Sequence, residues 1–155
     1  MLIGKYLTLE ECCKSATAIR LGIDNKPNQQ QVFALQSLAT NVYDKVCEKF
    51  LLKIPITSMF RSKELNAAIS GSSASSQHMQ GEAMDLDLDG TMNGVTNVQL
   101  FNYIRFNLEF DQLIWEFGTD TNPDWVHVSY DVSGKNRRNV FKAFRANGRA
   151  HYKPY

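Results

Sequence analysis

The pattern of apolar residues changes along the chain, and this change limits the fold more than any other feature. Between Asn28 and Phe50, apolar residues recur at spacings of three and four, which predicts one long amphipathic helix. Its apolar face comprises Val32, Leu35, Ala39, Val42, Val46 and Phe50. Strand-like segments follow at 53–60, 82–88, 111–117, 124–130 and 139–144. Helices that come mainly before a cluster of strands favour an α+β domain over a regularly alternating α/β sheet.

Shorter helices are expected around this framework. Thr8 and Glu11 have the spacing of a capping box that opens a short helix. One or two helical turns are expected at 63–69, and a longer helix at about 95–108. The chain has 155 residues, no internal repeat and no long linker, so we expect a single domain over 1–155. Its core should span about 8–145, with the tail 147–155 loosely held.

The balance of charges argues against several kinds of partner. The chain has 17 basic and 16 acidic residues, whereas a protein that binds nucleic acid usually carries a basic excess. No stretch approaches the roughly 18 apolar residues of a membrane-spanning helix. The N-terminal segment, with Lys5 and Glu10, lacks the apolar run of a signal peptide. We therefore expect a monomer made in the cytoplasm that binds neither nucleic acid nor membrane.

The least usual composition lies at 70–77, where seven of the eight residues are Ser, Gly or Ala. This run ends directly on His78, so a long loop that forms part of a site is a better interpretation than a linker. His78 lies seven residues before Asp85, and Gly81 between them tolerates the positive φ that a returning loop needs. If 82–88 is a strand, Asp85 lies on its polar face.

A second histidine lies within the predicted strand 124–130. His127 shares a face of this strand with Trp125 and Ser129. Asp124 precedes His127 by three residues, an odd spacing that would place it on the opposite face of a regular strand. Asp124 must therefore lie at an irregular start of the strand, which Pro123 favours.

Two imidazoles and one carboxylate form a ligand set suited to zinc. A catalytic zinc site has three protein ligands and keeps its fourth position for water, whose pKa the metal lowers toward neutrality. Such a site also needs a base that does not bind the metal, and Asp124 is the candidate. Each signal alone is weak, because an isolated histidine is more often an exposed loop residue or a hydrogen-bonded core residue.

Together, these segments resemble a known family. Residues 76–85 read SQHMQGEAMD, the pattern SxHxxGxAxD, and DWVH follows at 124–127. This is similar to the zinc D-alanyl-D-alanine carboxypeptidases and the related phage L-alanyl-D-glutamate endopeptidases, which have the DD-peptidase/Hedgehog fold. The resemblance spans about residues 8–145 and includes TSMFRS at 57–62, where the family has an SGYRS segment. Met59 and Phe60 stand where Gly and Tyr are common.

The resemblance implies roles for individual residues. The zinc ligands would be His78, Asp85 and His127, on one face of an antiparallel-rich sheet. Asp124 would be the catalytic base, and Arg61 would contact the substrate and help to hold the developing negative charge. Ser76 and Glu116 are further candidates for substrate binding, and Glu116 is also the alternative base.

The substrate implied by the resemblance is a stem peptide of bacterial peptidoglycan. Carboxypeptidase and endopeptidase action both remain open. A phage or prophage enzyme of this kind would act on the cell wall after lysis, from a virus particle or after export outside the Sec route.

Two other classes of function also remain open. A catalytically silent wall-binding or virion domain would have lost a ligand or the base, and every one of those positions is filled. A structural zinc site would need a fourth ligand, and neither a cysteine nor another histidine lies near the motifs. Cys12, Cys13 and Cys47 are expected to be reduced thiols, mostly buried.

Overall fold

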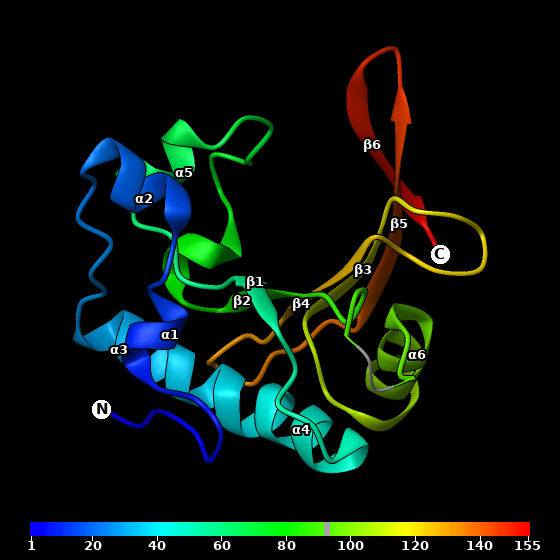
Figure 1. Cartoon of the computed structure of the whole chain (residues 1–155), viewed down its shortest axis with the longest axis horizontal. Coiled ribbons are helices and arrows are strands. Elements are labelled where there is room, and N and C mark those ends of the chain that lie inside the picture. The colour runs from blue at the N-terminus through cyan, green and yellow to red at the C-terminus, as the bar shows by residue number, and fades with distance from the viewer. Residues whose placement is uncertain (92–93) are drawn as a thin grey trace.

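A six-stranded mixed sheet forms the centre of the computed structural model, which describes residues 1–91 and 94–155 (Figure 1). The strands are β1 (Ile56–Ser58), β2 (Ala83–Leu86), β3 (Gln112–Glu116), β4 (Trp125–Ser129), β5 (Asn139–Ala146) and β6 (Arg149–Pro154). Their order across the sheet is β1-β2-β4-β3-β5-β6. Every neighbouring pair of these strands is antiparallel except β3 and β5, which run parallel. The prediction of an α+β domain is confirmed.

The long N-terminal helix packs against one face of this sheet. It consists of α3 (Gln29–Leu38), a π-helical turn (Ala39–Tyr43) and α4 (Asp44–Phe50). Asn28 caps it as predicted, because its side chain accepts a hydrogen bond from the Gln31 N–H at 2.9 Å. Four residues of the predicted apolar face are fully buried: Leu35, Ala39, Val42 and Val46.

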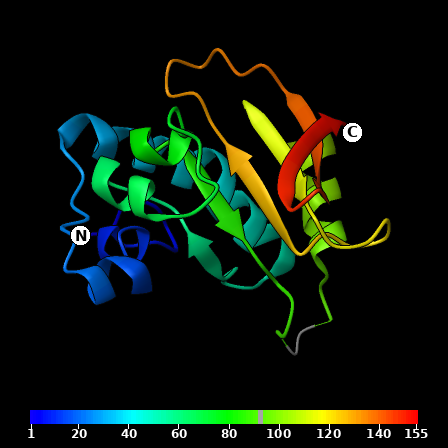
Figure 2. The ribbon, with the colours of Figure 1, turned by 90° about the horizontal axis from the view of Figure 1, so that it is seen from above.

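Five shorter helices in the described part of the chain complete the fold. They are α1 (Leu9–Cys12), α2 (Ala16–Leu21), α5 (Lys63–Ala68), the 3-10 helix η2 (Gln77–Gln80) and α6 (Asn97–Asn107). The capping box of Thr8 and Glu11 opens α1 as predicted. Seen from above, the N-terminal helices lie on one side and α6 on the other, with β2 and β4 between them (Figure 2). Among residues 1–91 and 94–155, no helix is long and apolar enough to cross a membrane.

The two faces of the sheet differ in chemistry because side chains alternate along each strand. Six fully or almost fully buried side chains of the central strands join the helices in one hydrophobic core: Met84, Leu86, Leu113, Trp115, Val126 and Val128. The opposite face carries the intervening residues: Asp85, Ile114, Glu116, Trp125 and His127. Above this second face, α5 stands on one side and the β5–β6 hairpin on the other (Figure 1).

Most of the segment 147–155 forms β6, which pairs with β5 along its whole length. Asn147 and Gly148 both have positive φ, 51° and 73°, and connect the strands as a two-residue turn. Asn-Gly is the strongest short signal for such a turn, so this hairpin was readable from the sequence. Tyr155 then packs against Trp115, with ring centroids 5.7 Å apart.

Candidate metal centre

Three candidate residues come together on the face of the sheet opposite the hydrophobic core. Asp85 on β2 and His127 on β4 are direct cross-strand partners, and His78 reaches them from η2. His127 Nδ1 lies 2.8 Å from Asp85 Oδ1, and His78 Nε2 lies 3.3 Å from Asp85 Oδ2. One donor atom from each of the three lies within 4.8 Å of the others, so the group could hold a metal ion.

The loop that carries His78 is fixed by hydrogen bonds at both ends. The Ser76 hydroxyl accepts from the His78 N–H at 3.3 Å, which caps η2. Ser76 therefore has a structural role in orienting this loop. Gly81 ends η2 with a φ of 78°, as the sequence predicted. A Cβ at Gly81 would lie only 2.6 Å from the Gln31 carbonyl oxygen, and the Gln31 amide donates to the Met79 carbonyl at 2.9 Å. The first turn of α3 thus holds the loop in place.

The orientation of the His78 ring is also fixed. Its Nδ1 lies 2.6 Å from the Met59 carbonyl oxygen, which can only accept a hydrogen bond. Nδ1 therefore donates to this carbonyl, and Nε2 faces the Asp85 carboxylate. A backbone carbonyl in this position is the usual partner of a metal-binding histidine. Met59 stands where the family that the motifs resemble commonly has glycine, but the contact uses only its backbone.

Asp85 remains ionised although it is buried. Burial alone would raise its pKa, but the His78 and His127 rings outweigh that effect and hold the pKa well below its ordinary range. Arg61 adds an ion pair, with Nη2 2.9 Å from Asp85 Oδ2. Arg61 Nε also donates to the Ser58 hydroxyl at 2.8 Å. The guanidinium that we expected to contact substrate thus orients a candidate metal ligand.

Glu116 lies on the same face with only 6% of its surface exposed. Burial raises the pKa of Glu116 to about 7. The positive influences of His127 and Arg61 oppose this rise, whereas the Asp85 carboxylate adds to it. A carboxyl group with this pKa exchanges its proton near neutral pH, which is useful in acid–base chemistry.

Asp124 lies at the entrance to β4. The strand begins at Trp125, so Asp124 precedes the regular part, as the sequence predicted. Its side chain is exposed and accepts no hydrogen bond from the described residues, and its backbone N–H donates to the Glu116 carbonyl at 2.9 Å. Two residues that the sequence did not indicate also position this backbone. The side-chain amide of buried Asn97 donates to the Asp124 carbonyl at 3.0 Å. Gly118 packs so closely that a Cβ there would lie 2.7 Å from the Asp124 nitrogen.

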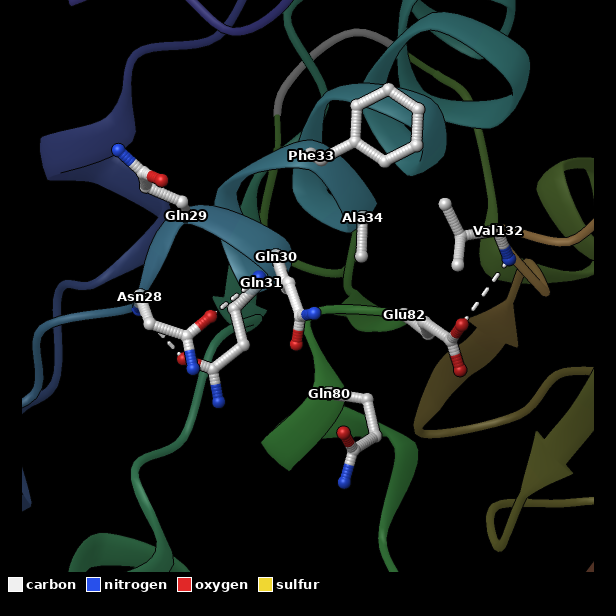
Figure 3. A pocket seen from close by; sticks show the side chains of 9 residues that line it. All are labelled: Asn28, Gln29, Gln30, Gln31, Phe33, Ala34, Gln80, Glu82 and Val132. Carbon is white, nitrogen blue, oxygen red and sulfur yellow. Dashed lines mark hydrogen bonds between the residues drawn. The ribbon is translucent and has the colours of Figure 1, made fainter.

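A separate cavity of about 640 Å³ lies between the start of α3 and the η2–β2 connection. Its walls carry the amides of Gln29, Gln30 and Gln80 together with the Glu82 carboxylate (Figure 3). None of the candidate site residues lines this cavity. The candidate metal-binding and catalytic residues therefore lie outside this cavity.

Comparison with known proteins agrees with this geometry. The sequence pattern of the family described as Peptidase M15 matches residues 5–129, well over half of the chain and all of the candidate site residues named from the sequence. No curated protein matches the chain. The match confirms the resemblance seen in the motifs at 76–85 and 124–127. The chain therefore belongs to the Peptidase M15 family and is a metallopeptidase.

Proposed function

We propose that this protein hydrolyses a peptide bond in the stem peptides of bacterial peptidoglycan, using zinc held by His78, Asp85 and His127. The observation that carries the proposal is the convergence of these three side chains on one face of the sheet. The substrate class is taken from the family resemblance. We treat residues 1–155 as a single peptidase domain of the DD-peptidase/Hedgehog type.

The donor set fits zinc in both chemistry and spacing. Zinc prefers imidazole and carboxylate ligands at about 2.0–2.2 Å in a tetrahedral arrangement, which places neighbouring ligand atoms roughly 3.3–3.5 Å apart. The separation of 3.3 Å between His78 Nε2 and Asp85 Oδ2 is close to that spacing, whereas the 2.8 Å between His127 Nδ1 and Asp85 Oδ1 is a hydrogen bond that a bound metal would replace. Three protein ligands are the number typical of a catalytic site. When bound, zinc would polarise the scissile carbonyl and lower the pKa of the attacking water.

The chain's own residues handle the proton and the charge. Asp124 accepts the proton of the attacking water and passes it to the leaving amine, a role supported by its exposed carboxylate, which is unpaired among the described residues. Glu116 contacts the bound peptide and is the alternative base, since its pKa of about 7 suits proton exchange. Arg61 holds Asp85 through Nη2, while Nη1 has no acceptor among the described residues and is free to donate to the substrate.

The test is digestion of purified peptidoglycan by the metal-free protein with and without added zinc. We expect cleavage only with zinc, and mass spectrometry of the released ends assigns the bond. Release of D-alanine indicates a carboxypeptidase, and new D-glutamate amino termini indicate an L-alanyl-D-glutamate endopeptidase. His151→Ala is the matched control, because this exposed histidine stacks on Phe144 in the hairpin and belongs to no candidate group among the described residues. Absence of zinc-dependent cleavage refutes the proposal.

A further inference from the structure

The β5–β6 hairpin extends the face of the sheet that carries the candidate metal ligands. Glu116 on β3 is the direct partner of Ala143 on β5, and Ala143 is the direct partner of Tyr152 on β6. Directly opposite residues of neighbouring strands place their side chains on the same face. Tyr152 therefore lies on the same face as Glu116, two strands away, or roughly 10 Å between backbones.

The residue between them is a small alanine that other side chains cover. Ala143 is buried, with only 1% of its surface exposed, whereas Tyr152 retains 54% exposure. A phenol is long enough to extend over an alanine toward the neighbouring strand. Tyr152 thus lies on the same face as the site, and its exposed surface is accessible to a ligand.

The pKa of Tyr152 agrees with a position on the face that carries the Glu116 and Asp85 carboxylates. Burial raises the pKa of Tyr152, the carboxylates of Glu116 and Asp85 raise it further, and the Arg145 guanidinium opposes this rise. Because the shift favours the protonated form, the hydroxyl remains a hydrogen-bond donor at neutral pH.

The hairpin also has a charge that suits an anionic peptide. Residues 139–155 contain Lys142, Arg145, Arg149 and Lys153 and no Asp or Glu. Lys142 is paired with Asp120, whereas Arg145 lies over the Phe117 ring at 4.4 Å without an acidic partner among the described residues. Arg145 shares the face of Ala143 and Tyr152, whereas Lys142 and Lys153 are register partners in line with Trp115 on the core face. Stem peptides of the proposed substrate class carry free carboxylates, which Arg145 attracts.

We propose that Tyr152 is a substrate-contacting residue whose hydroxyl donates a hydrogen bond to an oxygen of the peptide bound beside the metal ligands. The inference rests on the proposed function and extends it. Arg61 and Ser58 lie at the β1 edge of the sheet and Tyr152 at the β6 edge, so the peptide is held from both sides. Tyr152 lies outside the matched residues 5–129, which makes this contact a feature of the C-terminal hairpin.

The test compares Tyr152→Phe with Tyr155→Phe, two variants that each lose one hydroxyl from the end of the chain. Tyr155 is the matched control because its ring packs against Phe101 and Trp115 on the other face of the sheet. On a soluble stem peptide, Tyr152→Phe should raise KM roughly 3- to 10-fold, the ratio expected for one neutral hydrogen bond, with kcat within about twofold. Tyr155→Phe should match the parent in both constants, and zinc content should be equal in all three proteins.

Calorimetric binding of the same peptide separates this inference from the proposed function. The measurement uses the zinc-loaded Asp124→Asn protein with and without Tyr152→Phe, so that turnover does not interfere. Weaker binding by the protein that carries Tyr152→Phe supports the contact even if the parent does not cleave the wall, an outcome that would refute only the hydrolysis. Equal binding, or equal KM, with and without Tyr152→Phe overturns the contact while leaving the hydrolysis intact. A parent protein that neither binds nor cleaves the peptide overturns both.

Discussion

Replacing Glu116 with glutamine should stabilise the metal-free protein at alkaline pH. Glu116 has a pKa of about 7 in the folded chain against an ordinary value of 4.5. Between these values the folded state binds more protons than the unfolded state, so stability falls as pH rises. A glutamine side chain has nearly the same shape as the protonated carboxyl group but does not ionise, so the Glu116→Gln variant lacks this loss.

The size of the effect follows from the two pKa values. A group that shifts from 4.5 to about 7 costs the folded state about 1 kcal/mol at pH 5 and about 3 kcal/mol at pH 8. The advantage of Glu116→Gln over the parent should therefore grow by about 2 kcal/mol between these conditions. Solvent screens these interactions little, because only 6% of Glu116 is exposed.

The assay is urea unfolding in the presence of a chelator at pH 5, 6.5 and 8. Glu64→Gln, which replaces an exposed glutamate of α5, is the control and should follow the parent at every pH. Adding zinc should reduce the gap between Glu116→Gln and the parent, because a nearby cation favours the ionised carboxylate. Parallel pH profiles for Glu116→Gln and the parent would refute the burial argument and place Glu116 in contact with solvent.

Four other substitutions test the site. His127→Ala should lose the zinc that the parent binds at close to one ion per chain, measured by metal analysis; full retention would exclude it as a ligand. Asp124→Asn should retain zinc while turnover falls about 100-fold or more, and near-normal turnover would move the base to Glu116. Arg61→Ala should weaken zinc affinity roughly 10- to 100-fold in a competition titration, because it releases the Asp85 carboxylate; unchanged affinity would show that the ion pair does not orient this ligand. Gly81→Ala should lower thermal stability more than Gly134→Ala, which has the same φ of 78° but open space around it; equal losses would rule out the close approach at Gly81.

Local chemistry made much of the fold predictable. Asn28 and Thr8 indicated helix starts because a capping side chain satisfies backbone donors only a few residues away. The positive φ of Gly81 followed from the need to return His78 toward Asp85. These features depend on residues close together in the sequence, so they can be predicted from it.

Features that depend on strand register were not predictable in the same way. The parallel pairing of β3 and β5 joins segments separated by β4, and neither segment shows by its pattern which partner it has. The ion pair between Arg61 and Asp85 and the position of Tyr152 opposite Ala143 follow from that register. The β6 strand is different, because Asn147-Gly148 is a turn signal that local reasoning should have used.

The exposure of β6 has a consequence for hydrogen exchange. All six of its residues are exposed, and it forms the outer edge of the sheet with β5 as its neighbour. Such a strand opens locally at a small fraction of the global unfolding free energy. Its amide protons should therefore exchange far faster than those of β2, where all four residues are buried. The strand that carries Tyr152 should therefore exchange its amide protons before the strand that carries Asp85 does.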